Sequence, residues 1–281
     1  MARKNIGLYN SGANNTQNHQ LIIELGNDEL VCMSVNTENG TADAFELFQL
    51  DKGYKDDWND IFYEIKAASG IFNSNFKQVL CYFNSPESLM VPEKLLTATS
   101  AEDYLNLVFG ESTRHEVKYE KLHSTKAFIN AYRIRKSIVE LLNRQFVIFK
   151  SSHIYSNIIN DVFNRTRLDD NLIKIQFYSH HFIIAVWKDK KFQLIQSFTF
   201  NQTEDILYYL LRISHQFDFD NANTVLELSG MLDIESAIYG QINKLFTQIR
   251  LDCVHQASGV FLSALDEYPA HYLTPYYKLI Q

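Results

Sequence analysis

Glycine and proline are scarce in this sequence, with ten glycines and four prolines among 281 residues, both below average usage. No glycine occurs between Gly110 and Gly230, so a phosphate-binding turn in that stretch would have to form without one. Cysteine is also rare. Cys32, Cys81 and Cys253 lie far apart in apolar runs without CxxC spacing, which favours reduced, buried thiols.

An excess of positive charge is missing as well. The formal charge of −7, from 26 basic and 33 acidic residues, provides no overall field to attract nucleic acid or anionic lipid. No apolar run approaches the length of a membrane helix. Residues 1–20 lack the apolar segment of a secretory signal and are predicted to be a disordered polar tail. We therefore expect a cytoplasmic protein with no nucleic-acid partner and no integral membrane segment.

What the sequence does contain is a repeated pattern. A shift of 152 residues aligns "IELGNDELVCMSV" with "IQFYSHHFIIAVW" and pairs Ile23 with Ile175 and Leu30 with Phe182. In each copy two strands flank a polar turn, and a third strand follows, "AFELFQL" or "KFQLIQSFTF". An amphipathic helix, a short apolar strand and a further helix, strand and helix come next, which predicts a mixed-sheet α/β unit in each half. A chance similarity over thirteen residues is the alternative.

The later elements are placed from apolar spacing. In the first half they are "YRIRKSIVELLNR", "QFVIFK" and "YSNIINDVF", and in the second half a helix at 234–248, the strand "RLDCVHQ" and a short helix at 260–265. Extra residues from 86 to about 131 form an insertion with one helix-like and two strand-like segments. The predicted domains are 21–165, 172–266 and an aromatic C-terminal tail at 267–281, with a polar link at 164–171.

This order of elements resembles the actin-like ATPase fold, which consists of two ribonuclease H-like halves with mixed five-stranded sheets, here with an insertion in the first half. Within that superfamily the chain is similar to pilus-assembly and secretion-platform members. It looks most like an uncharacterised domain-of-unknown-function family of Bacteroides-group bacteria. Active superfamily members bind nucleotide between the halves, with one strand-turn-strand loop from each half and a glycine-rich turn near the nucleoside. The resemblance thus implies where a nucleotide would bind.

The first loop matches the superfamily pattern in part. Glu24 and Gly26 stand where the family has an acidic residue and a glycine, and Asn27 follows. Asp28 and Glu29 follow at the expected loop tip, where two carboxylates would repel a polyphosphate. The loop therefore has half of what phosphate binding requires, and Gly26 is predicted to serve only the turn between two strands.

The second loop departs further from the pattern. Gln176 replaces the acidic residue and Tyr178 replaces the glycine, with Ser179 after it. A tyrosine at this point fills the space where backbone amides would contact phosphate. The third element keeps Ser229 and Gly230, but Met231 stands where a second glycine is expected. These residues predict a vestigial nucleotide site, with at most weak nucleotide binding and no catalytic residue.

Other polar residues give weaker signals. His180 and His181 are adjacent, so on a strand they point to opposite faces and cannot chelate one metal together; both are expected to be exposed in a turn, with no metal bound. Asp218 and Asp220 are explained by a solvated loop. The basic run Arg133 to Lys136 is expected to form the exposed face of a helix.

Four tyrosines and two prolines in residues 268–281 favour a docking segment, folded back on its own chain or, as the alternative, offered to another chain.

The sequence therefore predicts a non-catalytic actin-like module for interaction or assembly, with another protein as its partner. A divergent ATPase or small-molecule kinase is the rival, and it needs a basic side chain from Arg133 to Lys136 or from the insertion. A ribonuclease H-type nuclease would need clustered carboxylates on a metal, and Gln176 removes one of them.

Overall fold

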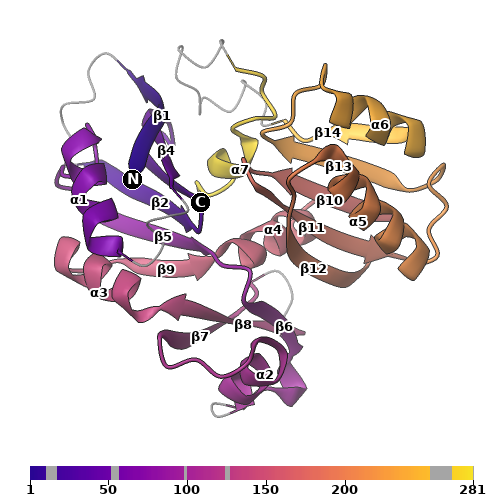
Figure 1. Cartoon of the computed structure of the whole chain (residues 1–281), viewed down its shortest axis with the longest axis horizontal. Coiled ribbons are helices and arrows are strands. Elements are labelled where there is room, and N and C mark those ends of the chain that lie inside the picture. The colour runs from indigo at the N-terminus through magenta and orange to yellow at the C-terminus, as the bar shows by residue number, and fades with distance from the viewer. Residues whose placement is uncertain (11–17, 52–56, 98–99, 124–126, 254–267, 281) are drawn as a thin grey trace. The chain divides into compact units, whose positions relative to one another are not determined.

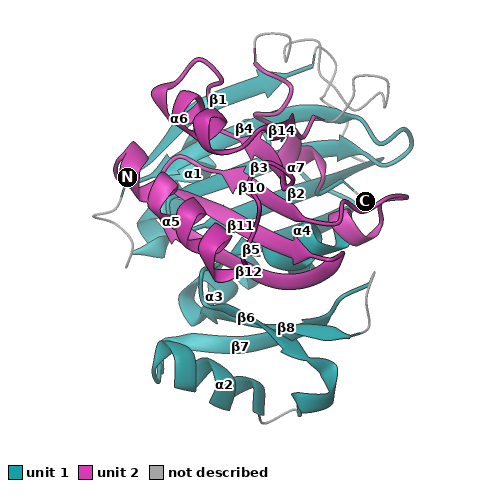
Figure 2. Cartoon of the chain, turned by 90° about the vertical axis from the view of Figure 1, so that its right-hand side faces the viewer, with its two compact units in different colours: residues 1–160, 256–267, 279–281 teal, residues 161–255, 268–278 magenta. Residues whose placement is uncertain are grey.

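The computed structural model describes residues 1–281 apart from 11–17, 52–56, 98–99, 124–126, 254–267 and 281. The described residues form two compact units, one within 1–160 with 279–280, and one within 161–253 with 268–278 (Figure 2). Among them, no helix has the length and hydropathy needed to span a membrane.

The main sheet of unit 1 has six strands in the order β1-β4-β3-β2-β5-β9 (Figure 1). Its elements are β1 (Ala2–Tyr9), β2 (His19–Gly26), β3 (Glu29–Asn36), β4 (Ala42–Leu50), α1 (Trp58–Ala68), β5 (Gln78–Asn84), α3 (Lys136–Gln145), β9 (Lys150–His153) and the start of α4 (Ile154–Phe163). β2, β3 and β4 form an antiparallel meander, whereas β5 and β9 run parallel to β2. The parallel pairing requires the crossover helix α1. Side chains from one face of this sheet pack with α1 and α3 in one apolar core.

The insertion in unit 1 is a small layer of its own. It comprises β6 (Ser88–Pro92), a short 3₁₀ helix η3 (Glu93–Leu95), α2 (Ser100–Phe109), β7 (His115–Lys121) and β8 (Phe128–Arg135). The strands form a sheet in the order β6-β8-β7, and α2 buries Ala101 and Leu105 against it.

Unit 2 repeats the arrangement of unit 1. It contains β10 (Leu172–Phe177), β11 (His181–Lys188), β12 (Lys191–Thr199), α5 (Thr203–Gln216), β13 (Val225–Gly230), α6 (Ala237–Leu245), β14 (Gln248–Leu251) and α7 (Thr274–Tyr277). The sheet order β12-β11-β10-β13-β14 matches β4-β3-β2-β5-β9 strand for strand. Leu25 pairs with Leu30 in unit 1, and Phe177 pairs with Phe182 in unit 2. The ladders therefore keep the shift of 152 residues, and the predicted duplication is confirmed.

Several local predictions are wrong. Residues 2–9 are not a disordered tail but strand β1, which pairs antiparallel with β4 and makes the sheet six-stranded rather than five-stranded. Arg133 to Arg135 belong to β8, and α3 begins only at Lys136. The run "QFVIFK" is not a strand, because β9 begins at Lys150.

In unit 2, His181 is buried at the start of β11 rather than exposed. The helix predicted at 260–265 lies outside the described residues.

Candidate functional site

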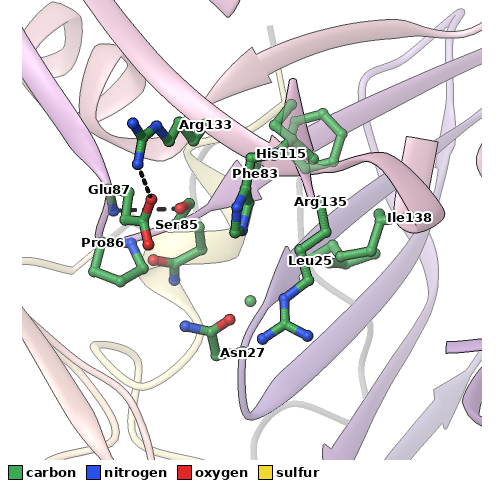
Figure 3. Close-up of a pocket in the computed structure, with 13 residues that line it drawn as sticks. Leu25, Asn27, Phe83, Ser85, Pro86, Glu87, His115, Arg133, Arg135 and Ile138 are labelled. Carbon is green, nitrogen blue, oxygen red and sulfur yellow. Dashed lines mark hydrogen bonds and ion pairs between the residues drawn. The ribbon is translucent and has the colours of Figure 1, made fainter. Parts of the chain in front are cut away.

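The first-loop residues lie at the end of β2, at the edge of a small pocket in unit 1. Gly26 and Asn27 line this pocket of about 130 Å³, together with residues that follow β5 and residues of β7 and β8 (Figure 3). Glu24 lies two residues before Gly26 in β2 and does not line the pocket. The Glu24 carboxylate is 3 % exposed and accepts a hydrogen bond of 2.9 Å from the Asn84 amide. Only two of the three first-loop residues therefore face the pocket.

The two carboxylates after Asn27 behave differently from expectation. Asp28 and Glu29 are both buried, and neither lines the pocket. They therefore do not form a repulsive loop tip, and the predicted obstacle to an anion is absent at this position.

Basic residues of β8 do reach the pocket. Arg133 donates to Glu87 at 3.3 Å, to the Gly110 carbonyl at 2.7 Å and to Asn106, so its charge is used inside the insertion. In Figure 3 a dashed line joins Arg133 to Glu87, whereas the guanidinium of Arg135 lies away from that pair and on the side of Asn27. The half-buried Arg135 is the second basic side chain of the pocket lining.

His115 completes the pocket wall. Burial, assisted by the neighbouring arginines of β8, lowers the pKa of His115, and Ser112 contacts its Nδ1 at 2.7 Å. The imidazole is consequently neutral at neutral pH. No pattern in the sequence pointed to His115, because it lies far from the first loop along the chain.

The second-loop residues and the third element meet in unit 2. In the parallel ladder Gln176 pairs with Ser229 and Phe177 pairs with Gly230. Gly230 has φ +85°, and a Cβ there would lie 2.1 Å from the Phe177 carbonyl oxygen. Only glycine fits this backbone.

Tyr178 fills the position of the missing second-loop glycine. Tyr178 is 2 % exposed, and its ring stacks on His181 with ring centroids 4.4 Å apart. Its hydroxyl accepts a hydrogen bond from the Gln176 amide. Ser179 beside it contacts the Met231 sulfur at 3.5 Å. A packed aromatic side chain therefore occupies this turn.

The C-terminal segment, residues 268–278, covers this same corner of unit 2. The Gly230 amide donates to the His271 carbonyl at 2.8 Å, and the His271 ring contacts the Leu232 carbonyl at 2.7 Å. Tyr276 of α7 packs edge-on against Tyr178, with ring centroids 6.4 Å apart. The segment therefore docks on its own chain, as the sequence favoured. The residues that it contacts include Tyr178 and Gly230, which the resemblance assigned to a nucleotide site.

A charge network anchors the end of the segment. Lys278 contacts Asp161 at 2.9 Å and Asp252 at 2.6 Å. The network as a whole contains Asp161, Arg165, Asp169, Lys174, Glu227, Arg250, Asp252 and Lys278. Burial opposes ionisation, but the neighbouring cations outweigh it and lower the pKa of Glu227 and of Asp161. The four carboxylates and four cations thus balance each other.

Comparisons with known proteins agree with this architecture. The family model described as a protein of unknown function, DUF3822, matches residues 10–249. The chain belongs to this family. No curated protein matches it.

A solved structure from Bacteroides thetaiotaomicron, of a protein with an actin-like ATPase fold and unknown function, is similar at 20 % identity and a TM-score of 0.75. The match covers 84 % of this chain and 91 % of that one. The PilM–PilN type IV pilus biogenesis complex contains a chain similar at 11 % identity and a TM-score of 0.61, with 92 % of this chain and 97 % of that chain covered. The DUF3822 chain therefore has the actin-like ATPase fold, as two ribonuclease H-like halves with an insertion in the first.

Proposed function

We propose that this DUF3822 protein is a non-catalytic actin-like module that acts by binding another protein. The observation that carries the proposal is the covered corner of unit 2. The Gly230 amide is bonded to His271, and Tyr178 and Tyr276 pack together beside it. A nucleotide that used these residues would have to displace both the C-terminal segment and a buried aromatic ring.

The pocket in unit 1 supports the same conclusion. Its volume of about 130 Å³ is well below the roughly 300–1,000 Å³ of ordinary small-molecule sites. Glu24 is turned to Asn84 rather than to the pocket. The residues Glu24, Gly26 and Asn27 in unit 1 and Gln176, Tyr178, Ser179, Ser229 and Gly230 in unit 2 are thus best explained as a vestigial site.

A protein partner is supported by the insertion. Leu107, Val108 and Phe109 at the end of α2 are exposed, Leu107 by 83 %, and clustered exposed apolar side chains mark protein interaction surfaces. The PilM chain, which shares this fold, is in a complex with another protein, PilN. The insertion of the DUF3822 protein is where we place its partner contact.

Titration with Mg-ATP tests the absence of a working site. We expect no saturable heat in calorimetry, no thermal shift and no release of phosphate. Glu24→Gln should change none of these, and Glu235→Gln, an exposed carboxylate of unit 2, is the matched control. Tight saturable binding of Mg-ATP, with turnover that falls in Glu24→Gln but not in Glu235→Gln, would contradict the proposal.

Affinity capture from extract of the native host tests the partner. Wild type and Val147→Asp, which carries an equal charge at a fully exposed apolar position outside the insertion, should retain the same protein. Leu107→Asp should lose it. Equal capture by all three chains would place the partner surface elsewhere.

One observation favours a second candidate function, a divergent nucleotide-dependent enzyme. Arg135 supplies the basic side chain beside Gly26 and Asn27 that such an enzyme needs. On this hypothesis Arg135→Gln would weaken Mg-ATP binding at least about tenfold, the order expected for a charged hydrogen bond. Arg144→Gln, on the exposed surface of α3, would not.

A further inference from the structure

Where β2 and β5 begin, the unit 1 sheet carries polar side chains on the face opposite the α1 and α3 core. Alternate residues of a strand point to opposite faces, and Leu21, Val79 and Cys81 belong to the core beneath α1 and α3. Gln20 and Gln78 point the other way and are direct neighbours in the parallel ladder between β2 and β5. Two amide side chains therefore lie next to each other on the sheet.

A cavity of about 540 Å³ lies over this polar face. Its floor is formed by Gln20, Gln78 and residues of β9, its walls by the end of β7 and by α4. Apart from Leu80 and Cys81, the lining is polar, with hydroxyls of Tyr82, Ser151, Ser152 and Ser156 and amides of Asn157 and Asn160. The volume falls within the range of small-molecule sites, and it is about four times that of the pocket at Gly26.

Gln20 is the unusual member of the lining. The residue is only 8 % exposed, yet its side-chain amide makes no hydrogen bond to any described residue. Gln78 likewise has no side-chain partner among the described residues. Both amides therefore border the cavity with donors and acceptors that no described residue uses. An occupant that both donates and accepts would bond to them.

The ionisable side chains of the lining are of both signs: Glu120, Lys121, His123 and Lys150. Glu120, the carboxylate in the wall, accepts from the Ser152 hydroxyl at 3.0 Å and from the His153 amide at 2.9 Å, and burial raises its pKa. It would repel an anion, and a single carboxylate that already accepts two hydrogen bonds is a poor cation site. Lys121 and Lys150 are exposed at the rim, and Lys121 is paired with Glu93.

We propose that this cavity binds a neutral, polyhydroxylated small molecule of about the size of a monosaccharide. The amides of Gln20 and Gln78 each offer a donor and an acceptor, and the hydroxyl oxygens of Ser151 and Ser152 can accept. Together they complement the hydroxyls of a ligand. The site lies within unit 1 and is independent of the vestigial nucleotide residues and of the apolar end of α2.

Saturation-transfer NMR with D-glucose, D-galactose and N-acetyl-D-glucosamine as probes tests the site in the full chain. At least one probe should bind wild type saturably, with a dissociation constant at or below about 1 mM. Gln20→Leu and Gln78→Leu should each weaken it about tenfold, since each removes a hydrogen bond to the ligand. Gln193→Leu, at an exposed position of β12, should bind as wild type does.

Stability provides a second readout that needs no ligand. Without ligand, Gln20→Leu should not lower the melting temperature, because the Gln20 amide makes no hydrogen bond to a described residue. An amide with a structural role would give a lower melting temperature in Gln20→Leu.

Gluconate and glucosamine, the charged analogues, should bind more weakly than the neutral sugars. The proposal is overturned if no neutral probe saturates, if both leucine variants bind as wild type does, if a charged analogue binds best, or if Gln20→Leu melts at a lower temperature.

Discussion

Gly26 and Gly230 both stood out in the sequence, but only the backbone at Gly230 requires glycine. Gly26 was expected to serve the turn after β2, but its φ is not in the left-handed region, and a Cβ there would be 3.5 Å from the nearest backbone oxygen, an ordinary contact. Gly230 has φ +85° and no room for a Cβ. The difference could not be read from the sequence, because Phe177, which excludes the Cβ, is brought to Gly230 only by the parallel ladder.

Alanine at each glycine measures this difference. Gly230→Ala should lower the free energy of unfolding by about 2–4 kcal/mol, through a strained φ and a collision with the Phe177 backbone. Gly26→Ala should change it by no more than about 1 kcal/mol. Urea denaturation of both variants checks this, and equal losses would mean that the turn after β2 also requires glycine.

At the scale of elements, the C-terminal segment packs against the second-loop residue Tyr178 and bonds to Gly230. The aromatic composition of residues 268–281 predicted docking, but the receiving surface could not be predicted, because Lys278 meets Asp161 and Asp252 from 117 and 26 residues away.

Strand β1 was missed for a different reason. Its residues alternate between half-buried and exposed, the weak pattern of an edge strand, which has little apolar content.

Lys278→Met tests how firmly the segment is held. Loss of the contacts with Asp161 and Asp252 should cost about 1–3 kcal/mol and speed amide hydrogen exchange at Tyr276 and Tyr277. Lys190→Met is the control, because its pair with Asp170 is exposed and such pairs contribute at most about 1 kcal/mol. Unchanged exchange in Lys278→Met would show that the aromatic packing alone holds the segment.

At the scale of the whole molecule, the duplicated architecture was the part best predicted from sequence. Apolar alternation and the shift of 152 residues depend only on local periodicity, and the ladders of β2–β3 and β10–β11 keep that register. The end of β8 was assigned to a helix because "RIRK" continues into an amphipathic run, and the strand there is fixed by pairing with β7 and β6. Such long-range pairing also placed Arg135 in the pocket.

The two units should respond to acid in different pH ranges. In unit 1, Tyr155 donates its amide to Nδ1 of the buried His153, so Nε2 carries the proton and donates to the Ser85 carbonyl at 3.0 Å. Burial lowers the pKa of His153 from 6.5 to about 3. Between these values the unfolded chain binds more protons, so the stability of unit 1 falls as the pH drops below 6.5, by up to about 1.4 kcal/mol per pH unit.

In unit 2 the sensitive groups are carboxylates. The pKa values of Glu227 and Asp161 are lowered in the fold from 4.5 and 3.8, so the stability that their ionisation gives is present above those values and is lost as the pH falls below them. Unit 2 should therefore hold its stability through the range in which unit 1 weakens.

The two tryptophans allow the units to be followed separately. Trp58 is buried in unit 1 and Trp187 in unit 2. Trp187→Phe therefore leaves Trp58 as the fluorescent reporter of unit 1, and Trp58→Phe leaves Trp187 as the reporter of unit 2. Urea midpoints should fall between pH 6.5 and 4.5 for the Trp58 signal and only below about pH 4.5 for the Trp187 signal.

Adding His153→Gln, which keeps a donor for Ser85, should weaken the first dependence and leave the second unchanged. Glu120, whose pKa burial raises, acts in the opposite direction, and His115, whose pKa burial lowers, acts in the same direction. Both are present in both backgrounds, so the comparison isolates His153. A Trp58 midpoint with the same pH dependence in both backgrounds would assign the acid sensitivity of unit 1 to other groups.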